Sequence, residues 1–157
     1  MTEDDFIWVE GFKHIRYYNR SFDEPEMSER VKEYLDWMNA RRSVRDFSDT
    51  PVSREIIDNI IRTASTAPSG ANKQPWTFCV VESAEMKKKI RLAAEEEERR
   101  SYNERMSEQW LNDLKHLGTD ANKPFLEIAP YLIIVFKRPY EIDKNGEKHQ
   151  NYYVNES

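Results

Sequence analysis

The chain has 157 residues with a formal net charge of −5, and 34% of its residues are charged and 12% aromatic. The length predicts a single domain, the aromatic content excludes a disordered chain, and the acidic charge argues against nucleic acid as a partner. No apolar run approaches the ~20 residues of a membrane span, and the acidic first five residues lack the apolar stretch of a signal peptide, so we expect a soluble, cytoplasmic protein.

The first third of the chain predicts an arm followed by two helices. Residues 1–24 are rich in aromatic side chains without periodicity, and are expected to pack against another surface, such as a second subunit. Apolar residues at helical spacing predict a helix over 28–39, and a second helix is predicted to begin after Ser53 as its N-cap. The predicted apolar faces are Val31, Tyr34, Leu35 and Met38 in the first helix and Ile56, Ile57, Ile60, Ile61 and Ala64 in the second.

Two polar helical segments are predicted in the middle of the chain. The first begins after Ser83 as N-cap, and its acidic and basic run at 95–100 is expected to be almost wholly solvated. The second ends near Gly118. Its apolar residues are Met106, Trp110, Leu114 and Leu117.

Two apolar runs predict strands, at 76–81 and 131–136. The only cysteine, Cys79, lies in the first of them and is expected to be buried and inert. Residues 143–146 predict a turn, and residues 152–157 predict the start of another helix. Because two strands rarely form an independently stable sheet, further strands are expected from a longer chain or a partner.

Two segments carry the candidate chemistry. Three arginines in the run Arg41-Arg42-Ser43-Val44-Arg45 form a site for a dianion, although cations at a helix end also interact with the helix dipole. The loop 67–74 leads directly into the first strand and is expected to present backbone N–H groups, although it is also an ordinary helix-to-strand connection. Gly70 is expected to provide a special backbone angle there. Together these segments favour a phosphate-bearing cofactor.

Several other chemistries lack support. The sequence has no G-x-G-x-x-G, no G-x-x-x-x-G-K-[ST] and no G-x-S-x-G motif. His14, His116 and His149 lack metal-ligand spacing, so no metal site is predicted. A single cysteine without a neighbouring histidine does not support thiol catalysis, and no catalytic residue is assigned.

Residues 40–157 resemble the nitroreductase-like flavoprotein superfamily and, within it, the iodotyrosine deiodinase family. The Arg-Arg-Ser-Val-Arg run, the run at 60–64, the loop with Pro75-Trp76-Thr77-Phe78 and the run Glu95–Glu98 with Tyr102 follow the family order. The resemblance implies an α+β fold with three α/β/α layers and a mainly antiparallel sheet, incomplete in this chain. Residues 1–39 would form an N-terminal arm and first helix, and 40–157 the front portion of an FMN-binding domain.

The same resemblance implies FMN bound at a homodimer interface. The residues matched to FMN binding are Arg41, Arg42, Ser43, Val44, Arg45, Pro68 and Ser69. The backbone N–H of Ala71 matches the group that binds a substrate phenolate.

Glu98, Tyr102 and Lys123 match the residues that bind the amino-acid end of the substrate, on a lid at about 95–125. Glu98 and Tyr102 are four residues apart and therefore share a helix face. A carboxylate, a tyrosine hydroxyl and an ammonium are together complementary to an amino-acid zwitterion. Without the resemblance, both charges would be interpreted as solvated surface groups.

The implied function is FMN-dependent reductive dehalogenation of mono- and di-iodotyrosine to tyrosine plus iodide. Electrons would come from NADPH or from a flavin-reducing partner. One alternative is an FMN nitroreductase or flavin reductase of other specificity. Another is a catalytically inactive truncated form, because the family's later segments, including a donor to the flavin N5, have no counterpart in these 157 residues.

Overall fold

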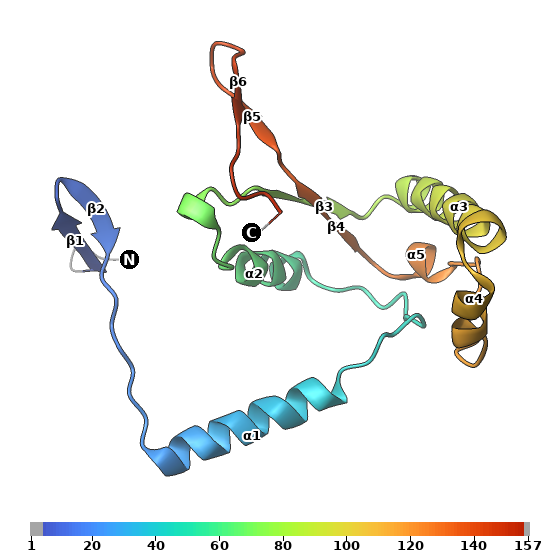
Figure 1. Ribbon diagram of the computed structural model, residues 1–157, viewed down its shortest axis with the longest axis horizontal. Helices are drawn as coiled ribbons and strands as arrows, with labels where there is room; N and C mark the ends of the chain where they lie inside the picture. The colour runs from blue at the N-terminus through green and yellow to red at the C-terminus, as the bar shows by residue number, and fades with distance from the viewer. Residues whose placement is uncertain (1–4, 156–157) are drawn as a thin grey trace. The chain divides into compact units, whose positions relative to one another are not determined.

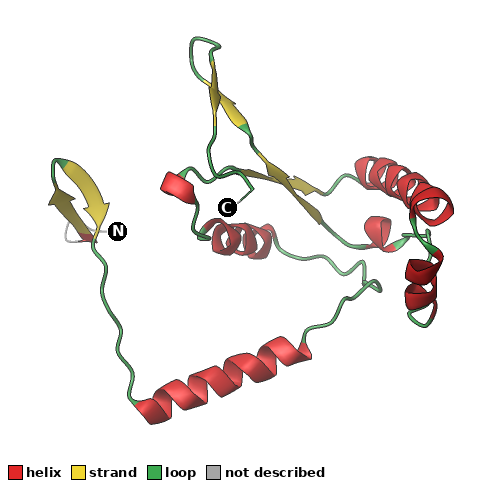
Figure 2. Cartoon of the chain, in the orientation of Figure 1, coloured by secondary structure: helices red, strands yellow, loops and turns green. Residues whose placement is uncertain are grey.

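The computed structural model describes residues 5–155 (Figures 1 and 2). The chain divides into two compact units between Ser43 and Val44. The sequence predicted a division between residues 39 and 40. The functional assignment of the two parts stays a prediction, and each unit is described by itself.

The first unit contains a hairpin that the sequence did not predict. Strands β1 (Phe6–Val9) and β2 (Phe12–Ile15) pair antiparallel, with Phe6 opposite Ile15. Glu10 and Gly11 connect them with φ angles of 50° and 84°. A two-residue hairpin turn of this hand normally carries Asn-Gly or Asp-Gly, so Glu-Gly gave only a weak signal. Residues 1–4 of the predicted arm lie outside the described range.

Helix α1 (Glu24–Ala40) begins earlier than its apolar pattern predicted. The Asp23 carboxylate accepts a hydrogen bond from the Glu26 N–H at 2.9 Å, and Pro25 occupies the first turn, where a missing N–H costs nothing. None of its residues is buried. The predicted apolar face of α1, namely Val31, Tyr34, Leu35 and Met38, is between 40% and 67% exposed.

The second unit mixes helices with antiparallel strand pairs, as Figure 2 shows. Ser53 and Ser83 are the N-cap residues of α2 and α3, as predicted, and the Ser83 hydroxyl accepts a hydrogen bond from the Met86 N–H at 3.4 Å. The elements are α2 (Arg54–Ser65), the 3-10 turn η2 (Gly70–Asn72), β3 (Trp76–Val81), α3 (Ala84–Arg100), the π-helical turn η3 (Ser101–Arg105), α4 (Glu108–Lys115), α5 (Phe125–Ile128), β4 (Leu132–Lys137), β5 (Tyr140–Ile142) and β6 (Lys148–Gln150).

The two predicted strands pair with each other. β3 has its predicted bounds, and β4 begins one residue later than predicted. Their antiparallel register places Trp76 opposite Lys137 and Val81 opposite Leu132. Cys79 is only half-buried, contrary to expectation, because the described elements leave part of this sheet uncovered, as the exposed β4 side chain Phe136 shows.

Strands β5 and β6 form a second hairpin that the sequence did not predict, since both are short and contain few apolar residues. The predicted turn between them is confirmed: the Asp143 carboxylate accepts hydrogen bonds from the N–H groups of Asn145 and Glu147 at 2.8 and 2.9 Å. Residues 152–155 form bends and a turn with a φ of 59° at Tyr153, so the helix predicted there is absent from the described part of 152–157.

The buried set is small and partly polar. Ile57 and Ala129 are buried apolar side chains, while Lys87 and Glu95 are buried polar ones at 8% and 6% exposure. The Lys87 ammonium donates to the Ala129 carbonyl at 2.8 Å and so connects α3 to the end of α5. No helix within residues 5–155 combines the length and apolar character needed to cross a bilayer.

The Lys87 contact predicts a measurable loss of stability. Lys87→Met should lower the free energy of unfolding by about 1.5–3 kcal/mol, because it removes a charged donor from a buried carbonyl. Lys88→Met, an exposed position on the same helix, should change it by less than about 0.5 kcal/mol. Urea unfolding followed by circular dichroism measures both, and equal effects would contradict a stabilising role for the Lys87 hydrogen bond.

Candidate functional site

A row of polar side chains runs along α3 and into η3. We name this set the polar stripe: Lys87, Arg91, Glu95, Glu98 and Tyr102, which recur every three or four residues and therefore share one helix face. Each of them contacts the segment 119–129. The partners are the Ala129 carbonyl for Lys87, the Glu127 carboxylate for Arg91, the Lys123 N–H for Glu95, the Lys123 ammonium for Glu98 and the Thr119 hydroxyl for Tyr102.

The structure brings Glu98, Tyr102 and Lys123 together, as the resemblance implied. The Lys123 ammonium lies 2.9 Å from a Glu98 carboxylate oxygen, and these side chains are 18% and 32% exposed. The Tyr102 hydroxyl donates to Thr119 Oγ1 at 3.0 Å. Tyr102 lies in the π-helical turn, a local widening of the helix that is frequent at functional sites.

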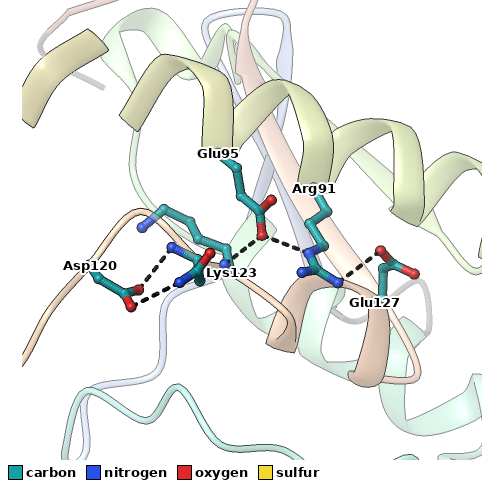
Figure 3. Close-up of polar contacts among 6 residues, drawn as sticks. Arg91, Glu95, Asp120, Lys123 and Glu127 are labelled. Atoms are coloured by element: carbon teal, nitrogen blue, oxygen red, sulfur yellow. Dashed lines mark hydrogen bonds and ion pairs between the residues drawn. The ribbon is translucent and has the colours of Figure 1, made fainter. Parts of the chain in front are cut away.

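Glu95 connects α3 to the backbone before α5 (Figure 3). One of its oxygens accepts both the Lys123 N–H at 2.8 Å and Arg91 Nε at 2.6 Å. Arg91 also donates to Glu127 on α5 at 3.2 Å. The hydrogen bond from the Lys123 backbone, and then that from Arg91, lower the pKa of Glu95 below its ordinary range, although burial opposes this. Glu95 is therefore a buried carboxylate held in its charged form.

Glu98, Tyr102 and Lys123 line a pocket of about 710 Å³ within the second unit. Glu98, Tyr102, Lys123 and Arg45 contribute its charged and hydroxyl groups. Asp120 and Asn122 add polar groups, and they bond to each other through the Asp120 carboxylate at 2.8 and 3.0 Å. The apolar lining comes from Met106, Trp110, Leu114, Leu117, Pro124 and Phe125. The pocket thus offers both charges of a zwitterion partner beside an apolar surface.

The loop 67–74 has an unusual backbone. Ala71 and Gln74 have φ angles of 50° and 45°, which non-glycine residues rarely adopt. The Ser69 hydroxyl accepts a hydrogen bond from the Gln74 N–H at 2.8 Å and fixes this conformation. Among the described residues, none accepts a hydrogen bond from the Ala71 N–H. Ala71 is exposed, so this donor is available to a ligand.

Gly70 does not provide the special backbone angle that the sequence predicted, because its φ is not positive. Its role is to leave space: a Cβ at this position would collide with the ring of Tyr153. The left-handed conformation lies instead at the residues that follow it.

The arginine run is divided between the two units, with Arg41, Arg42 and Ser43 in the first and Val44 and Arg45 in the second. Arg42 donates to the carbonyls of Asn39 and Arg41, which is the helix-end role considered from the sequence. The guanidinium groups of Arg41 and Arg45 form no ion pair within residues 5–155 and are exposed. Pro68 is exposed and Ser69 half-buried.

Asp143, Glu147 and His149 bring ligand atoms within 4.8 Å of one another, which histidine spacing alone did not predict. The Asp143 carboxylate is engaged by the turn N–H groups and by His149 Nε2 at 3.1 Å. Those bonds, with that from the Glu147 N–H the largest, lower the pKa of Asp143. The contacts of this cluster stabilise the turn between β5 and β6.

Three of the five members of the polar stripe, Lys87, Arg91 and Glu95, were not predicted from the sequence. The expectation that the acidic run is almost wholly solvated is wrong for Glu95, at 6% exposure, and for the half-buried Glu98, but correct for the exposed Glu96 and Glu97. Burial of a carboxylate requires partners, and these come from a segment 28 residues further along the chain. The spacing Arg91, Glu95, Glu98, Tyr102 was the available signal.

Residues 38–155 match the family model described as the nitroreductase family. The chain belongs to the nitroreductase family. A crystal structure of oxidized iodotyrosine deiodinase bound to FMN and 3-iodo-L-tyrosine shares its fold, with a TM-score of 0.62, 33% identity, and coverage of 67% of this chain and 56% of that chain. The predicted α+β class and nitroreductase-like fold are confirmed.

Sequence relatives confirm the resemblance to iodotyrosine deiodinases. The enzyme of Haliscomenobacter hydrossis is 54% identical over 143 residues, which are 91% of this chain and 64% of the relative. That of Danio rerio is 47% identical over 144 residues, 92% of this chain and 49% of the relative. Iodotyrosine deiodinase 1 of Homo sapiens is 46% identical over 154 residues, which are 96% of this chain and 53% of the relative. The chain therefore spans about half to two thirds of the length of these relatives.

The lowered pKa of Glu95 predicts a pH-dependent contact. A folded pKa below the unfolded value of about 4.3 means that Glu95 stabilises the fold above that pH, and that this contribution is lost as the pH falls through the folded pKa. A carbon-13 titration of the carboxyl groups should give Glu95 a midpoint below that of a glutamate in an unfolded peptide, and Arg91→Met should raise it. A Glu95 midpoint that matches that of an unfolded peptide would contradict the geometry.

Proposed function

We propose that the protein is an FMN-dependent reductive dehalogenase of iodotyrosines, and that this chain supplies the binding site for the amino-acid end of the substrate. The observation that carries the proposal is the meeting of Glu98, Tyr102 and Lys123 in one pocket. The named relatives and the FMN- and iodotyrosine-bound structural neighbour support it.

Glu98 and Lys123 would act as a zwitterion clamp. They already form an ion pair at 2.9 Å, so an amino acid would insert between them. Its ammonium would pair with Glu98 and its carboxylate with Lys123, leaving no charge unpaired. The Tyr102 hydroxyl, 3.0 Å from Thr119 Oγ1, is placed on the same pocket wall to hydrogen-bond the ligand. The apolar lining residues would cover the ring.

The donor set of the arginine run fits FMN. Arg41, Arg42 and Arg45 with Ser43 offer guanidinium and hydroxyl donors to a phosphate, and Arg41 and Arg45 have no competing carboxylate among residues 5–155. Val44 is included among the proposed FMN-binding residues because it lies within the arginine run. Once reduced by the electron donor, bound FMN would supply the two electrons that, with a proton, replace the carbon–iodine bond by a carbon–hydrogen bond and release iodide.

The loop 67–74 would contribute to both ligands. Pro68 and Ser69 are proposed to contact the flavin ring. The Ala71 N–H is proposed to donate to the substrate phenolate, since it has no acceptor among the described residues and its left-handed φ is fixed by the neighbouring Ser69–Gln74 bond. A donor aimed at the oxygen favours the charged phenolate over the phenol.

A second copy of the chain and an electron donor belong to the same proposal. The apolar side chains of α1 and of α2, where Ile56 and Ile60 are 52% and 50% exposed, support association into a homodimer. The donor would be NADPH or a flavin-reducing partner. The rival activity, a nitroreductase or flavin reductase acting on quinones or nitroaromatics, gives the Glu98–Lys123 pair no role, because such substrates carry no zwitterion.

The clamp predicts a selective loss of binding. In the flavin-loaded protein, Glu98→Gln should weaken 3-iodotyrosine binding by roughly 1.5–3 kcal/mol, the range for a hydrogen bond to a charged group. Binding of 2-iodophenol should barely change, because it lacks the ammonium and the carboxylate. Glu96→Gln, at an exposed position of the same helix, serves as the control. Flavin fluorescence titration measures each affinity, and equal losses for both ligands would show that Glu98 is not the clamp.

The arginine run predicts a loss of flavin without a loss of helix. Arg41→Ala should weaken FMN binding by roughly tenfold or more, as expected for removing one charged hydrogen bond. The circular dichroism of α1 should not change, since the Arg41 side chain makes no ion pair among the described residues. Arg30→Ala, which removes an exposed ion pair with Glu26, is the control for FMN binding. Full flavin occupancy in Arg41→Ala, Arg42→Ala and Arg45→Ala alike would return the run to a helix-end role.

A further inference from the structure

We propose that Glu95 is a positioning residue for Lys123: its buried carboxylate fixes the Lys123 backbone on α3 so that the Lys123 ammonium meets Glu98 across the pocket. The inference rests on the proposed clamp. It assigns to Glu95 an effect on ligand affinity that acts through Lys123 and not through direct contact.

The Lys123 backbone is held at both of its polar groups. Its N–H donates to Glu95 at 2.8 Å, and its carbonyl accepts the N–H of Leu126 at 3.1 Å in the first turn of α5. Pro124 follows, and a residue before proline is restricted to extended backbone angles. Little freedom remains in the direction of the Lys123 side chain as it leaves the backbone.

The side chain of Lys123 then runs away from Glu95, as Figure 3 shows, and its ammonium reaches Glu98. Glu95 and Glu98 are three residues apart on one face of α3. The same helix therefore holds the backbone of Lys123 with one carboxylate and its ammonium with another. Any shift of the segment 120–124 relative to α3 would disturb both bonds together.

Glu95 itself does not touch the pocket. It is 6% exposed and absent from the pocket lining, whereas Glu98 and Lys123 both line it. Arg91 holds the Glu95 carboxylate in place and reaches Glu127, which fixes α5 immediately beyond Lys123. The position of the clamp lysine is thus set by charges that a ligand never contacts.

The direct test uses the unsubstituted protein. A through-hydrogen-bond scalar coupling is expected between the Lys123 amide nitrogen and the Glu95 carboxyl carbon in a labelled sample. A resolved Lys123 amide signal without this coupling would overturn the inference, whatever the ligand affinities are. This measurement does not depend on any variant folding.

The functional test compares Glu95→Gln with Glu96→Gln in the flavin-loaded protein. Glu95→Gln should speed hydrogen exchange of the Lys123 amide by roughly tenfold and weaken 3-iodotyrosine binding by roughly tenfold, the ratio for about 1.4 kcal/mol. It should leave 2-iodophenol binding within about twofold, and Glu96→Gln should leave all three quantities unchanged. Equal weakening for both ligands would assign Glu95 to general folding of this region and overturn the inference.

A double-mutant cycle separates action through Lys123 from independent action. In a Lys123→Met background, which keeps the backbone N–H, Glu95→Gln should cause no further loss of 3-iodotyrosine affinity. Losses that multiply would overturn the inference and leave the proposed function intact. If the unsubstituted protein does not distinguish 3-iodotyrosine from 2-iodophenol, the clamp itself fails. Faster Lys123 exchange in Glu95→Gln would then still support the positioning contact.

Discussion

The packing of α3 against the segment 120–129 depends on the buried charge of Glu95. Taking a carboxylate out of water is costly unless hydrogen-bond donors and a counter-charge replace its hydration. Glu95 obtains both from Arg91 and the Lys123 N–H, and Arg91 extends the connection to Glu127. Because losing either donor would leave this buried charge with only part of its compensation, these bonds favour one arrangement of α3, the segment 120–124 and α5.

The polar stripe connects α3 and η3 to the segment 119–129 in a region with few buried apolar side chains. Its five members contact the segment 119–129 through directional bonds, from Lys87 at one end to Tyr102 at the other. An apolar interface tolerates small shifts in register, whereas hydrogen bonds to particular backbone groups do not. Where the stripe reaches the pocket, the Glu98 side chain is 32% exposed, against 8% for the Glu95 side chain. Glu98 is therefore accessible to a ligand, whereas Glu95 is not.

Local rules predicted much of the fold, because they depend on neighbouring residues. The helix starts at Ser53 and Ser83, the strand 76–81 and the turn at Asp143 all follow from capping, apolar runs and turn chemistry. The hairpins β1–β2 and β5–β6 were not predicted, because their strands are short and lack an alternation of apolar and polar residues. The burial of Glu95 was not predicted, because helical periodicity is judged from apolar residues. A charged helix face is therefore interpreted as solvated, whatever it contacts.

The candidate site also has features that local sequence rules predict and features that they do not. Glu98 and Tyr102 were predictable as a pair from their spacing, but only the family resemblance connected them to Lys123. The backbone of the loop 67–74 had no sequence signal at the residues that matter. Gly70 was expected to adopt the unusual conformation, yet the left-handed φ angles belong to Ala71, Asn72 and Gln74, and Gly70 instead leaves space for the Tyr153 ring. Which residue of a loop adopts the left-handed conformation depends on contacts with segments that are distant in the chain. Residue spacing does not predict those contacts.

The ion pair between Glu98 and Lys123 has a consequence for selectivity under the proposed function. A ligand with only an ammonium would pair with Glu98 and leave Lys123 without its partner, and a ligand with only a carboxylate would do the reverse. At 18% and 32% exposure these groups are partly desolvated, so an unpaired charge costs more here than at the surface. A zwitterion restores both pairs, and a neutral phenol disturbs neither. Selection for amino-acid ligands would therefore come from the penalty on half-matched ligands as much as from attraction to matched ones.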